Sequence, residues 1–154
     1  MERLPWENYA LLLAKTASIR SKDPWKKVGS CALRYDKSVA ACGYNGEPRG
    51  ISIDWSNRDE RRKRVIHSEI NTLAYCKPNE IWLLASTLLP CHTCIQSIAA
   101  YGVKKVVFEE IYQQDDLSLT LAGEFGIELV QIIFDKQAKQ YKINESKINI
   151  SDTI

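Results

Sequence analysis

The stretch RVIHSEINTLAYC, residues 64–76, decides the fold and raises the first chemical question. Its apolar residues recur at helical spacing, at Ile66, Ile70, Leu73 and Ala74. This pattern predicts a helix over 67–76 with one buried face. Within a helix, side chains two positions apart point about 200° away from each other. His67 and Glu69 can therefore share a site only in the first turn, where the backbone is still irregular.

The segments around this helix predict alternating helices and strands. Helical spacing predicts a first helix over 4–19, and two β-prone runs joined by a short turn predict an antiparallel hairpin. The remaining predictions are a loop over 45–63, strands over 81–86, 104–108 and 127–133, and helices over 90–101 and 115–122. Strands that alternate with helices after a hairpin predict an α/β fold with a mixed, mostly parallel sheet. We expect one domain over 1–134 and a polar tail over 135–154 that packs as an extra helix or arm, or frays.

The composition fits a soluble protein of one domain. The chain has 154 residues, of which 45% are hydrophobic and 26% charged, and no apolar run approaches the ~20 residues of a membrane span. The first fifteen residues lack the features of a secretory signal, so we expect a cytoplasmic location. Five cysteines, an odd number, argue against a disulfide framework. The net charge of +2 is low for a dedicated nucleic-acid binder, although the basic run 58–64 keeps that alternative open.

A second motif, LLPCHTC over 88–94, lies downstream of the His67 helix. Pro90 suits a helix start, and Cys91 and Cys94 stand three positions apart on one face of the turn that follows. We therefore expect the starts of the two helices, at His67 and at Pro90, to face the same point. The partial positive charge at each helix start favours the thiolates that a metal needs.

One histidine and two cysteines predict a catalytic zinc ion. Three such ligands leave a fourth position open for water, whereas structural zinc sites are closed by four. A zinc-bound water ionises near pH ~7, and its proton needs an acceptor that is not a ligand. Glu69 is placed for that role. The order His-x-Glu followed by Pro-Cys-x-x-Cys is the known signature of zinc deaminases.

Other readings of these residues stay open at this point. A Cys-x-x-Cys pair also serves redox chemistry, although no thioredoxin-like context surrounds this one. A closed zinc site needs a fourth ligand, but none of the remaining candidates has finger-like spacing. These candidates are Cys31, Cys42, Cys76 and His92. Glu69 alone fits a first-turn charge favoured by the helix dipole, but that reading leaves His67 and both cysteines unexplained.

Four stretches carry a resemblance to a known family. They are RSKDPWKKVG (20–29), GYNGEPRG (43–50), HSEIN (67–71) and PCHTC (90–94). Through them the chain resembles the deoxycytidylate (dCMP) deaminase family. The resemblance implies a three-layer α/β/α cytidine-deaminase-like fold with a five-stranded mixed sheet. It also implies hydrolysis of dCMP to dUMP and ammonia, which supplies dUMP for dTMP synthesis.

The resemblance also assigns roles to residues of the zinc site and the substrate. His67, Cys91 and Cys94 would hold one zinc ion, Glu69 would shuttle protons, and Asn45 would bond the deoxyribose. Tyr112 looks like the family's aromatic residue near the substrate, and an exposed loop tyrosine is the alternative. On chemical grounds, Arg20, Ser21 and Lys22 could grip a 5'-phosphate through charge-assisted hydrogen bonds, and a solvated loop is the alternative.

Many members of this family are homohexamers that dCTP activates and dTTP inhibits. The resemblance places these effectors, with Mg²⁺ accompanying the triphosphate, around the GYNGEPRG loop. The residues implied are Gly43, Tyr44, Asn45, Gly46, Arg49 and Gly50. The glycines would let the backbone approach a phosphate or a base closely, and the alternative is a flexible turn.

Two departures from the family pattern stand out. Ser68 occupies a position where the family usually has alanine; a hydroxyl there is small enough to be tolerated. The loop over 50–64 lacks the additional cysteine and histidine ligands that some members use for a second zinc, so we expect one zinc ion per subunit.

Two rival functions remain. A tRNA adenosine deaminase or another polynucleotide deaminase would use the same zinc chemistry, with Arg61 to Arg64 as part of an RNA-binding surface. The low net charge and the GYNGEPRG stretch weigh against this alternative. A non-enzymatic relative that keeps zinc only for folding is the other, and the presence of Glu69 argues against it.

Overall fold

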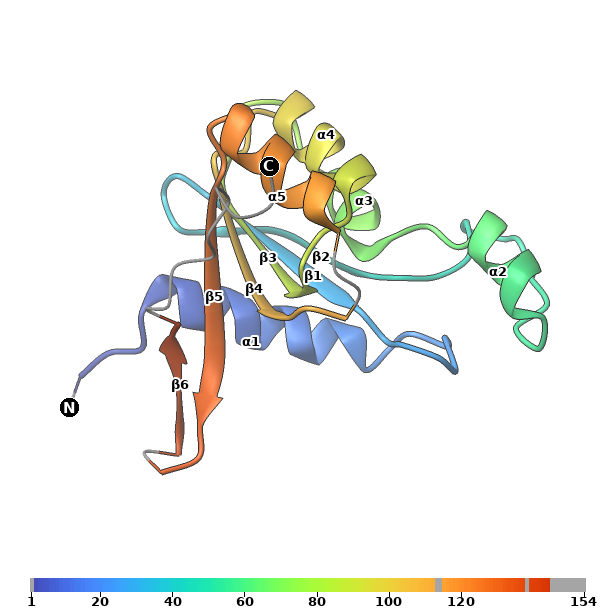
Figure 1. Ribbon diagram of the computed structural model, residues 1–154, viewed down its shortest axis with the longest axis horizontal. Coiled ribbons are helices and arrows are strands. Elements are labelled where there is room, and N and C mark those ends of the chain that lie inside the picture. Colours follow the sequence, from blue (N-terminus) through green and yellow to red (C-terminus); the bar gives the residue numbers. More distant parts are fainter. Residues whose placement is uncertain (1, 113–114, 138, 145–154) are drawn as a thin grey trace.

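A six-stranded mixed sheet forms the centre of the fold in a computed structural model that describes residues 2–112, 115–137 and 139–144 (Figure 1). The strand order is β2-β1-β3-β4-β5-β6. The strands are β1 (Gly29–Arg34), β2 (Val39–Tyr44), β3 (Ile81–Leu88), β4 (Lys105–Glu110), β5 (Glu128–Asp135) and β6 (Gln140–Ile143). The pairs β3/β4 and β4/β5 are parallel, whereas β1 pairs antiparallel with both β2 and β3, and β6 with β5.

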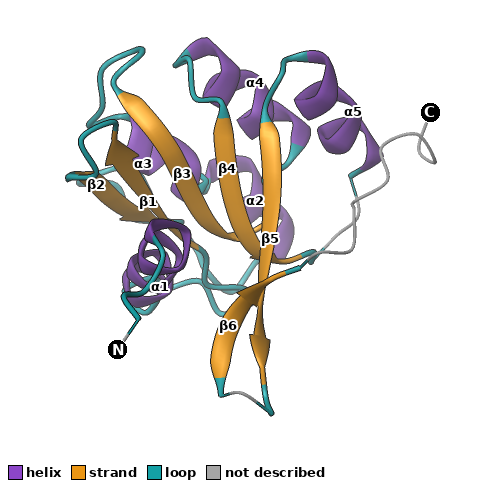
Figure 2. Cartoon of the chain, turned by 90° about the vertical axis from the view of Figure 1, so that its left-hand side faces the viewer, coloured by secondary structure: helices purple, strands orange, loops and turns teal. Residues whose placement is uncertain are grey.

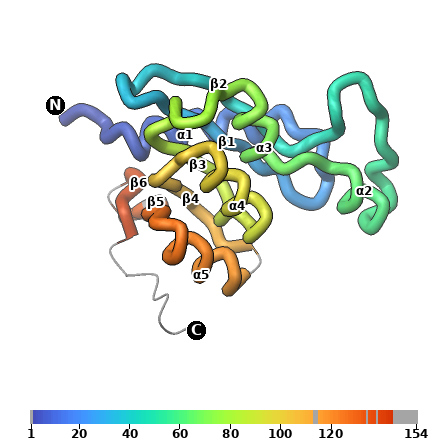
Figure 3. The backbone as a smooth tube through the Cα atoms, turned by 90° about the horizontal axis from the view of Figure 1, so that it is seen from above, coloured from blue at the N-terminus to red at the C-terminus, as the bar shows by residue number. Residues whose placement is uncertain are grey.

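Helices cover both faces of this sheet and complete the three-layer α/β/α architecture that we expected. α1 (Trp6–Ser18) lies on one face, and α3 (Ser68–Leu73), α4 (His92–Ala100) and α5 (Asp116–Glu124) lie on the other (Figure 2). α2 (Arg58–Arg64) projects from the side of the molecule, beyond both layers (Figure 3). In the described part of the chain, no helix combines the length and the apolar character that a membrane crossing requires.

The expectation of five strands was wrong, because the structure has six. β6 comes from the polar tail, where a strand of only four residues carries a single isoleucine and gives no clear apolar period. Its pairing with β5 joins residues 140–143 to the sheet edge. Residues 145–154 lie outside the described part of the chain, and the division of the chain at residue 134 stays a prediction.

The helix α2 was also not expected, since residues 45–63 were assigned to a loop. Asn57 caps this helix, because its side chain accepts a hydrogen bond of 3.1 Å from the backbone N–H of Glu60. The seven residues of α2 are all charged, so they show no apolar stripe of the kind that reveals a helix in sequence.

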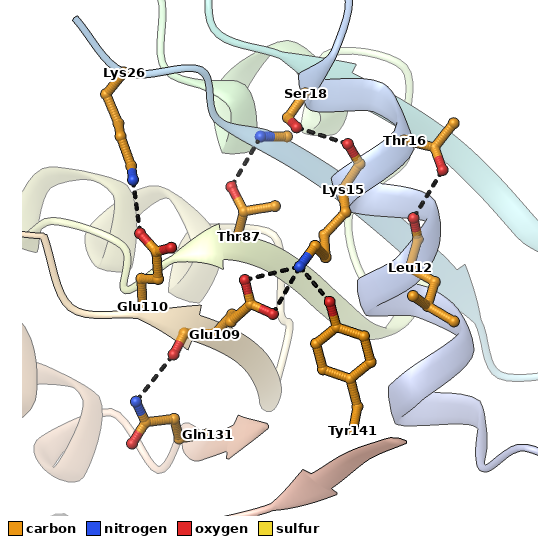
Figure 4. Close-up of polar contacts among 11 residues, drawn as sticks. Leu12, Lys15, Thr16, Ser18, Lys26, Thr87, Glu109, Glu110, Gln131 and Tyr141 are labelled. Atoms are coloured by element: carbon orange, nitrogen blue, oxygen red, sulfur yellow. Dashed lines mark hydrogen bonds and ion pairs between the residues drawn. The ribbon is translucent and has the colours of Figure 1, made fainter. Parts of the chain in front are cut away.

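Lys15 connects α1 to β4 and β6 (Figure 4). Its amine lies 3.0 and 2.9 Å from the two carboxylate oxygens of Glu109 and donates a further hydrogen bond to the hydroxyl of Tyr141. The side-chain amide of Asn8 donates to the backbone carbonyl of Tyr141 at 2.9 Å. Polar contacts from α1 therefore fix the position of the C-terminal strand.

Side chains along the strands point alternately to the two faces of the sheet, so the core consists of two clusters. Leu11 and Ala14 of α1 pack with Cys31 and Leu33 of β1 on one face. On the other face, a second cluster joins β1, β3 and β4 to the helices α3, α4 and α5. Its buried members are Ala32, Leu73, Ile81, Leu84, Ile95, Ile98, Val103, Val106, Ala122 and Ile127. The residues of β1 and β3 that alternate with the α1-facing ones therefore face α3.

Close backbone contacts set the helices on the sheet at Gly29 and Gly43. A Cβ atom on Gly29 would lie 1.9 Å from the carbonyl oxygen of Ala14, and one on Gly43 would lie 2.9 Å from the backbone nitrogen of Thr72. Any side chain at these positions would push α1 or α3 outward. The helix that carries Glu69 is therefore held directly against β2.

Candidate active site

Three side chains with metal-binding atoms converge where α3 and α4 begin. His67 directly precedes α3, Cys91 directly precedes α4, and Cys94 lies in the first turn of α4. Nδ1 of His67 lies 3.3 Å from Sγ of Cys94 and 3.5 Å from Sγ of Cys91. The three atoms all lie within 4.8 Å of one another. The structure thus brings together residues that 24 and 27 positions separate in sequence.

The donor set and its spacing fit a tetrahedral zinc ion. With Zn–S and Zn–N bonds of about 2.3 and 2.0 Å, an imidazole nitrogen and a sulfur at two corners of a tetrahedron lie about 3.5 Å apart. The nitrogen-to-sulfur distances of 3.3 and 3.5 Å agree with this value. Cys94 is buried, Cys91 is half-buried and His67 is exposed, so the cluster opens on one side.

The two cysteines do not share negative charge equally. The hydrogen bond with Cys94, the largest cause, lowers the pKa of Cys91 to about 3, and contacts with His67 and Thr93 act in the same direction against burial. The hydrogen bond to Cys91 and burial raise the pKa of Cys94. The hydrogen bond to Cys91 also raises the pKa of His67, although burial opposes it. Two thiolates this close repel each other, and a divalent cation between them offsets that repulsion.

Glu69 lies beside this cluster, in the first turn of α3, and only 4% of its surface is exposed. Its Oε1 atom accepts a hydrogen bond of 2.6 Å from the hydroxyl of Ser68. The hydroxyl of Ser86, on β3, lies 3.3 Å from the same oxygen. A buried carboxylate next to three metal-binding atoms has the position that a proton shuttle requires.

A cavity of about 460 Å³ opens over these residues, within the range of small-molecule sites. It is lined by Lys26, Val28, Asn45, Arg61, Val65, His67, Ser68, Glu69, Leu88, Leu89, Cys91, His92, Tyr112, Asp115 and Asp116. The lining therefore includes Asn45 and Tyr112, the two residues expected to lie near the substrate. It also has apolar walls from Leu88 and Leu89, against which a base can pack.

The side chain of Asn45 is already engaged with the protein. Its amide nitrogen donates to Asp23 Oδ2 at 3.1 Å and to the carbonyl of Lys26 at 2.9 Å, which uses both N–H groups. Its Oδ1 accepts the backbone N–H of Val28 at 2.8 Å. Because an amide oxygen has two lone pairs, one acceptor position remains for a hydroxyl of a ligand.

Arg20 and Lys22 line a second cavity, of about 710 Å³, and not the one over Glu69. Ser21 lies between them in sequence but is buried, and its hydroxyl donates to the carbonyl of Asn45 at 2.9 Å. The second cavity is lined by Arg20, Lys22, Cys42, Gly43, Tyr44, Asn45, Gly46, Glu47, Pro48, Arg49, Gly50, Ile51, Ser52, Asn71 and Tyr75. All six residues of the expected effector site are among them. Asn45 lines both cavities.

Two cations of the first cavity, Lys26 and Arg61, were not predicted from sequence as residues of this site. Lys26 forms an ion pair of 2.7 Å with Glu110 at the end of β4 (Figure 4), and its amine lies 5.4 Å from the centre of the Tyr112 ring. Arg61 reaches the cavity from α2. Lys26 belongs to the stretch RSKDPWKKVG, so its position was available in sequence, whereas nothing local distinguishes Arg61 within a run of basic residues.

His92 follows Cys91 but points to a different partner. Its backbone N–H and its Nδ1 atom each lie 2.9 Å from Oδ2 of Asp115. Nδ1 of His92 is therefore engaged with the residue that caps α5, and His92 stands outside the cluster of His67, Cys91 and Cys94.

Comparison with known proteins gives one consistent result. Residues 4–110 match the family described as the cytidine and deoxycytidylate deaminase zinc-binding region. Human deoxycytidylate deaminase is 30% identical to this chain over 129 residues, which cover 77% of this chain and 72% of the human protein. Deoxycytidylate deaminase of Mycobacterium phage D29 is 32% identical over 128 residues, which cover 70% of this chain and 97% of the phage protein.

A solved structure supports the same likeness. The dCMP deaminase of cyanophage S-TIM5, in complex with dCMP and dUMP, superposes with a TM-score of 0.66 at 25% identity. The superposition covers 84% of this chain and 99% of the cyanophage chain. The cyanophage deaminase and this chain therefore share their fold over nearly the whole of the former.

Proposed function

Because the chain belongs to the cytidine and deoxycytidylate deaminase family, we propose that it hydrolyses dCMP to dUMP and ammonia. The single observation that carries this proposal is the cluster of one imidazole and two thiol groups beside the buried carboxylate of Glu69. The match to relatives named deoxycytidylate deaminase supports dCMP as the substrate of this chain.

His67, Cys91 and Cys94 would hold a zinc ion, one per chain. When bound, this ion supplies an activated water at neutral pH and acts as a Lewis acid. Glu69 would take a proton from the attacking water and deliver protons to ring nitrogen N3 and to the departing amine. A C4–O bond forms, the C4–N bond breaks, and ammonia leaves, so the atoms of dCMP and water balance those of dUMP and ammonia.

We assign the sugar and the base to the walls of the first cavity. The free acceptor position of Asn45 suits the 3'-hydroxyl of the deoxyribose. Tyr112 and the leucines at the end of β3 offer surfaces for the pyrimidine ring. The side chain of Asn45 then keeps its hydrogen bonds to Asp23 and Lys26. The substrate uses only the acceptor position of Asn45 that has no partner in the described part of the chain.

For the 5'-phosphate we propose Lys26 and Arg61 in place of Arg20 and Lys22. Both residues line the first cavity, whereas Arg20 and Lys22 line the second. Nε of Arg61 is buried and has no hydrogen-bond partner among the described residues. Lys26 is paired with Glu110, whose side chain is 51% exposed. A phosphate can therefore compete with this exposed carboxylate for the amine of Lys26.

The test is an assay of ammonia release from dCMP, cytidine and a tRNA hairpin, together with metal analysis. We expect turnover of dCMP, with one zinc per chain. Glu69→Gln should keep the zinc and lose at least ~100-fold in rate. Glu124→Gln, an exposed change at the end of α5, is the matched control. Release of ammonia from the hairpin but not from dCMP would replace this proposal with a polynucleotide deaminase.

We further propose that the second cavity binds a regulatory deoxynucleoside triphosphate, with dCTP as activator and dTTP as inhibitor. Arg20, Lys22 and Arg49 provide positive charge for a polyphosphate, and Mg²⁺ would accompany it. Asn45 lines both cavities and gives the two sites a common wall. We expect a homo-oligomer, and a hexamer in particular. Arg49→Gln should weaken the response to both effectors while activity without effector stays unchanged.

A further inference from the structure

Three serine hydroxyls surround one oxygen of the Glu69 carboxylate. Oε1 lies 2.6 Å from the hydroxyl of Ser68, 3.3 Å from that of Ser86 and 3.5 Å from that of Ser30. The hydroxyls of Ser30 and Ser68 also lie 2.6 Å from each other. All three serines have 0% exposed surface, so water does not replace these contacts.

The three serines come from different elements that meet at one point of the sheet. Ser30 on β1 and Ser86 on β3 are direct partners across the antiparallel pair, so their side chains lie on the same face. Ser68 is the first residue of α3, which packs on that face. The hydroxyls are thus part of the contact between sheet and helix.

Counting protons fixes the order of the hydrogen bonds. A serine hydroxyl has one proton to donate, and the carboxylate of Glu69 can only accept. If Ser68 donates to Oε1, its proton is used, so the short contact between the two serines must be donated by Ser30. The chain then runs from the Ser30 hydroxyl to the Ser68 oxygen, and from the Ser68 hydroxyl to Oε1. The distance of 3.5 Å from Ser30 to Oε1 is at the limit for a hydrogen bond.

We propose that Ser68 is a positioning residue for Glu69, and that Ser30 acts on Glu69 through Ser68. This inference rests on the proposed function, since it gives the carboxylate its task.

The proposed effect of these hydrogen bonds is to orient the carboxylate of Glu69. Hydrogen bonds to Oε1 from Ser68 on α3 and from Ser86 on β3 restrict the rotation of the carboxylate and so fix the direction of its second oxygen. Removal of the Ser68 hydroxyl takes away the shortest of these bonds. It also leaves the buried Ser30 hydroxyl with only its 3.5 Å contact to Oε1, which costs free energy in itself.

The experiment compares four variants in zinc-loaded protein: Ser68→Ala, Ser30→Ala, the double variant, and Ser86→Ala. Each is measured for kcat, KM, zinc content, unfolding temperature, and affinity for a deoxyribonucleotide of hydrated pyrimidin-2-one, which mimics the transition state. We expect Ser68→Ala to lower kcat about tenfold, as removal of an outer partner of a catalytic group commonly does, with KM and zinc content unchanged. Affinity for the mimic should fall by the same factor.

The order of effects is the specific signature of the proposed chain. Ser30→Ala should lower kcat by a smaller factor than Ser68→Ala, and the double variant should equal Ser68→Ala, because the direct contact of Ser30 with Oε1, at 3.5 Å, is at the limit for a hydrogen bond and Ser30 acts through Ser68. Ser86→Ala should add its own reduction, since its hydroxyl contacts Oε1 directly. Additive effects of Ser30 and Ser68 on kcat, or lower unfolding temperatures with unchanged kcat and unchanged affinity for the mimic, would overturn the inference.

Failure of the inference and failure of the proposed function give different results. If the unaltered protein does not release ammonia from dCMP, the proposed function is wrong. If it does, and Ser68→Ala keeps the full kcat and the full affinity for the mimic, only the positioning role is wrong.

Discussion

Arg61 of α2 forms an ion pair with Asp23, which lies in the segment between α1 and β1 and whose side chain is fully buried. The guanidinium carbon of Arg61 also lies 5.0 Å from the centre of the Trp25 ring. α2 projects from the body of the molecule (Figure 3), yet these contacts tie its Arg61 side chain to a part of the chain 38 residues away. They place a cation in the wall of the first cavity.

Asp23→Asn should lower the free energy of unfolding by about 3 kcal/mol, because it leaves the charge of Arg61 nearly buried and unpaired. Urea unfolding at neutral pH measures the loss. The double variant Asp23→Asn with Arg61→Met removes both charges and should cost less than Asp23→Asn alone. A double variant as unstable as the sum of the single ones would mean that the two residues do not depend on each other.

Lys15→Met should loosen β6. The amine of Lys15 has partners on both β4 and β6, and we expect a loss of about 1 kcal/mol, a modest value because part of this side chain meets solvent. Hydrogen exchange should accelerate at residues 140–143 more than at β1. Lys104→Met, at an exposed position just before β4, is the control and should leave exchange in β6 unchanged.

The stabilisation that Lys15 provides through Glu109 and Tyr141 should depend on pH. Burial lowers the pKa of Lys15, but the hydrogen bonds with Tyr141 and Glu109 outweigh it and raise the pKa above its usual value. The stabilisation is therefore complete below the ordinary lysine pKa of about 10.4 and disappears as pH rises through the higher pKa of the folded state. Equal stability of the variant and the unaltered protein at pH 8 would contradict this prediction.

The cluster of His67, Cys91 and Cys94 could be predicted from sequence because its parts are local. Each ligand directly precedes or opens a helix, and a helix start orients the residues beside it whatever the rest of the fold does. The proximity of the starts of α3 and α4 followed from the order of strands and helices, which the sequence indicates clearly.

Arg61, β6 and the serines around Glu69 could not be predicted in the same way. Arg61 belongs to a helix in which every residue is charged, and contacts with the distant residues Asp23 and Trp25 distinguish it from Arg62 or Arg64. β6 shows no apolar period, because it lies at the edge of the sheet. Ser30 and Ser86 meet only through the register of β1 and β3, which no local pattern reveals.

Cys42 should react with thiol reagents at lower pH than an ordinary cysteine. It lies directly opposite Cys31 in the pairing of β1 with β2, and it is exposed. The hydrogen bond with Cys31 lowers the pKa of Cys42 to about 7, although burial opposes the shift. Because the thiolate is the reactive form, alkylation by iodoacetamide should reach half of its maximal rate near pH 7 and increase as pH rises.

Cys31→Ala is the matched variant for this prediction. It removes the hydrogen bond, so the midpoint of Cys42 alkylation should move up toward the ordinary cysteine pKa of about 8.5. Peptide mapping by mass spectrometry separates Cys42 from the other thiols. An unchanged midpoint in Cys31→Ala would show that Cys31 does not set the reactivity of Cys42.

Asp115 joins the start of α5 to the start of α4, and its removal should affect both. Its side chain caps α5 by accepting the N–H of Ser118 at 3.2 Å, and its other oxygen lies 2.9 Å from Nδ1 of His92. Asp115→Ala should lower the free energy of unfolding by about 1–2 kcal/mol, the usual cost of a lost helix cap. Asp115→Asn should cost less, because asparagine is also a good capping residue, although it lacks the charge.

The difference in the free energy of unfolding between the unaltered protein and each of these two variants should become smaller as pH falls. Burial raises the pKa of Asp115, but the hydrogen bonds from His92 and Ser118 outweigh it and hold the pKa below its usual value. The charged form therefore contributes stability above the unfolded pKa of about 3.9, and this contribution is lost as pH falls through the lower pKa of the folded state. Urea unfolding from pH 7 to pH 3 should show the gap to Asp115→Asn closing only below about pH 4. A gap that closes between pH 7 and pH 5 would mean that another group carries the effect.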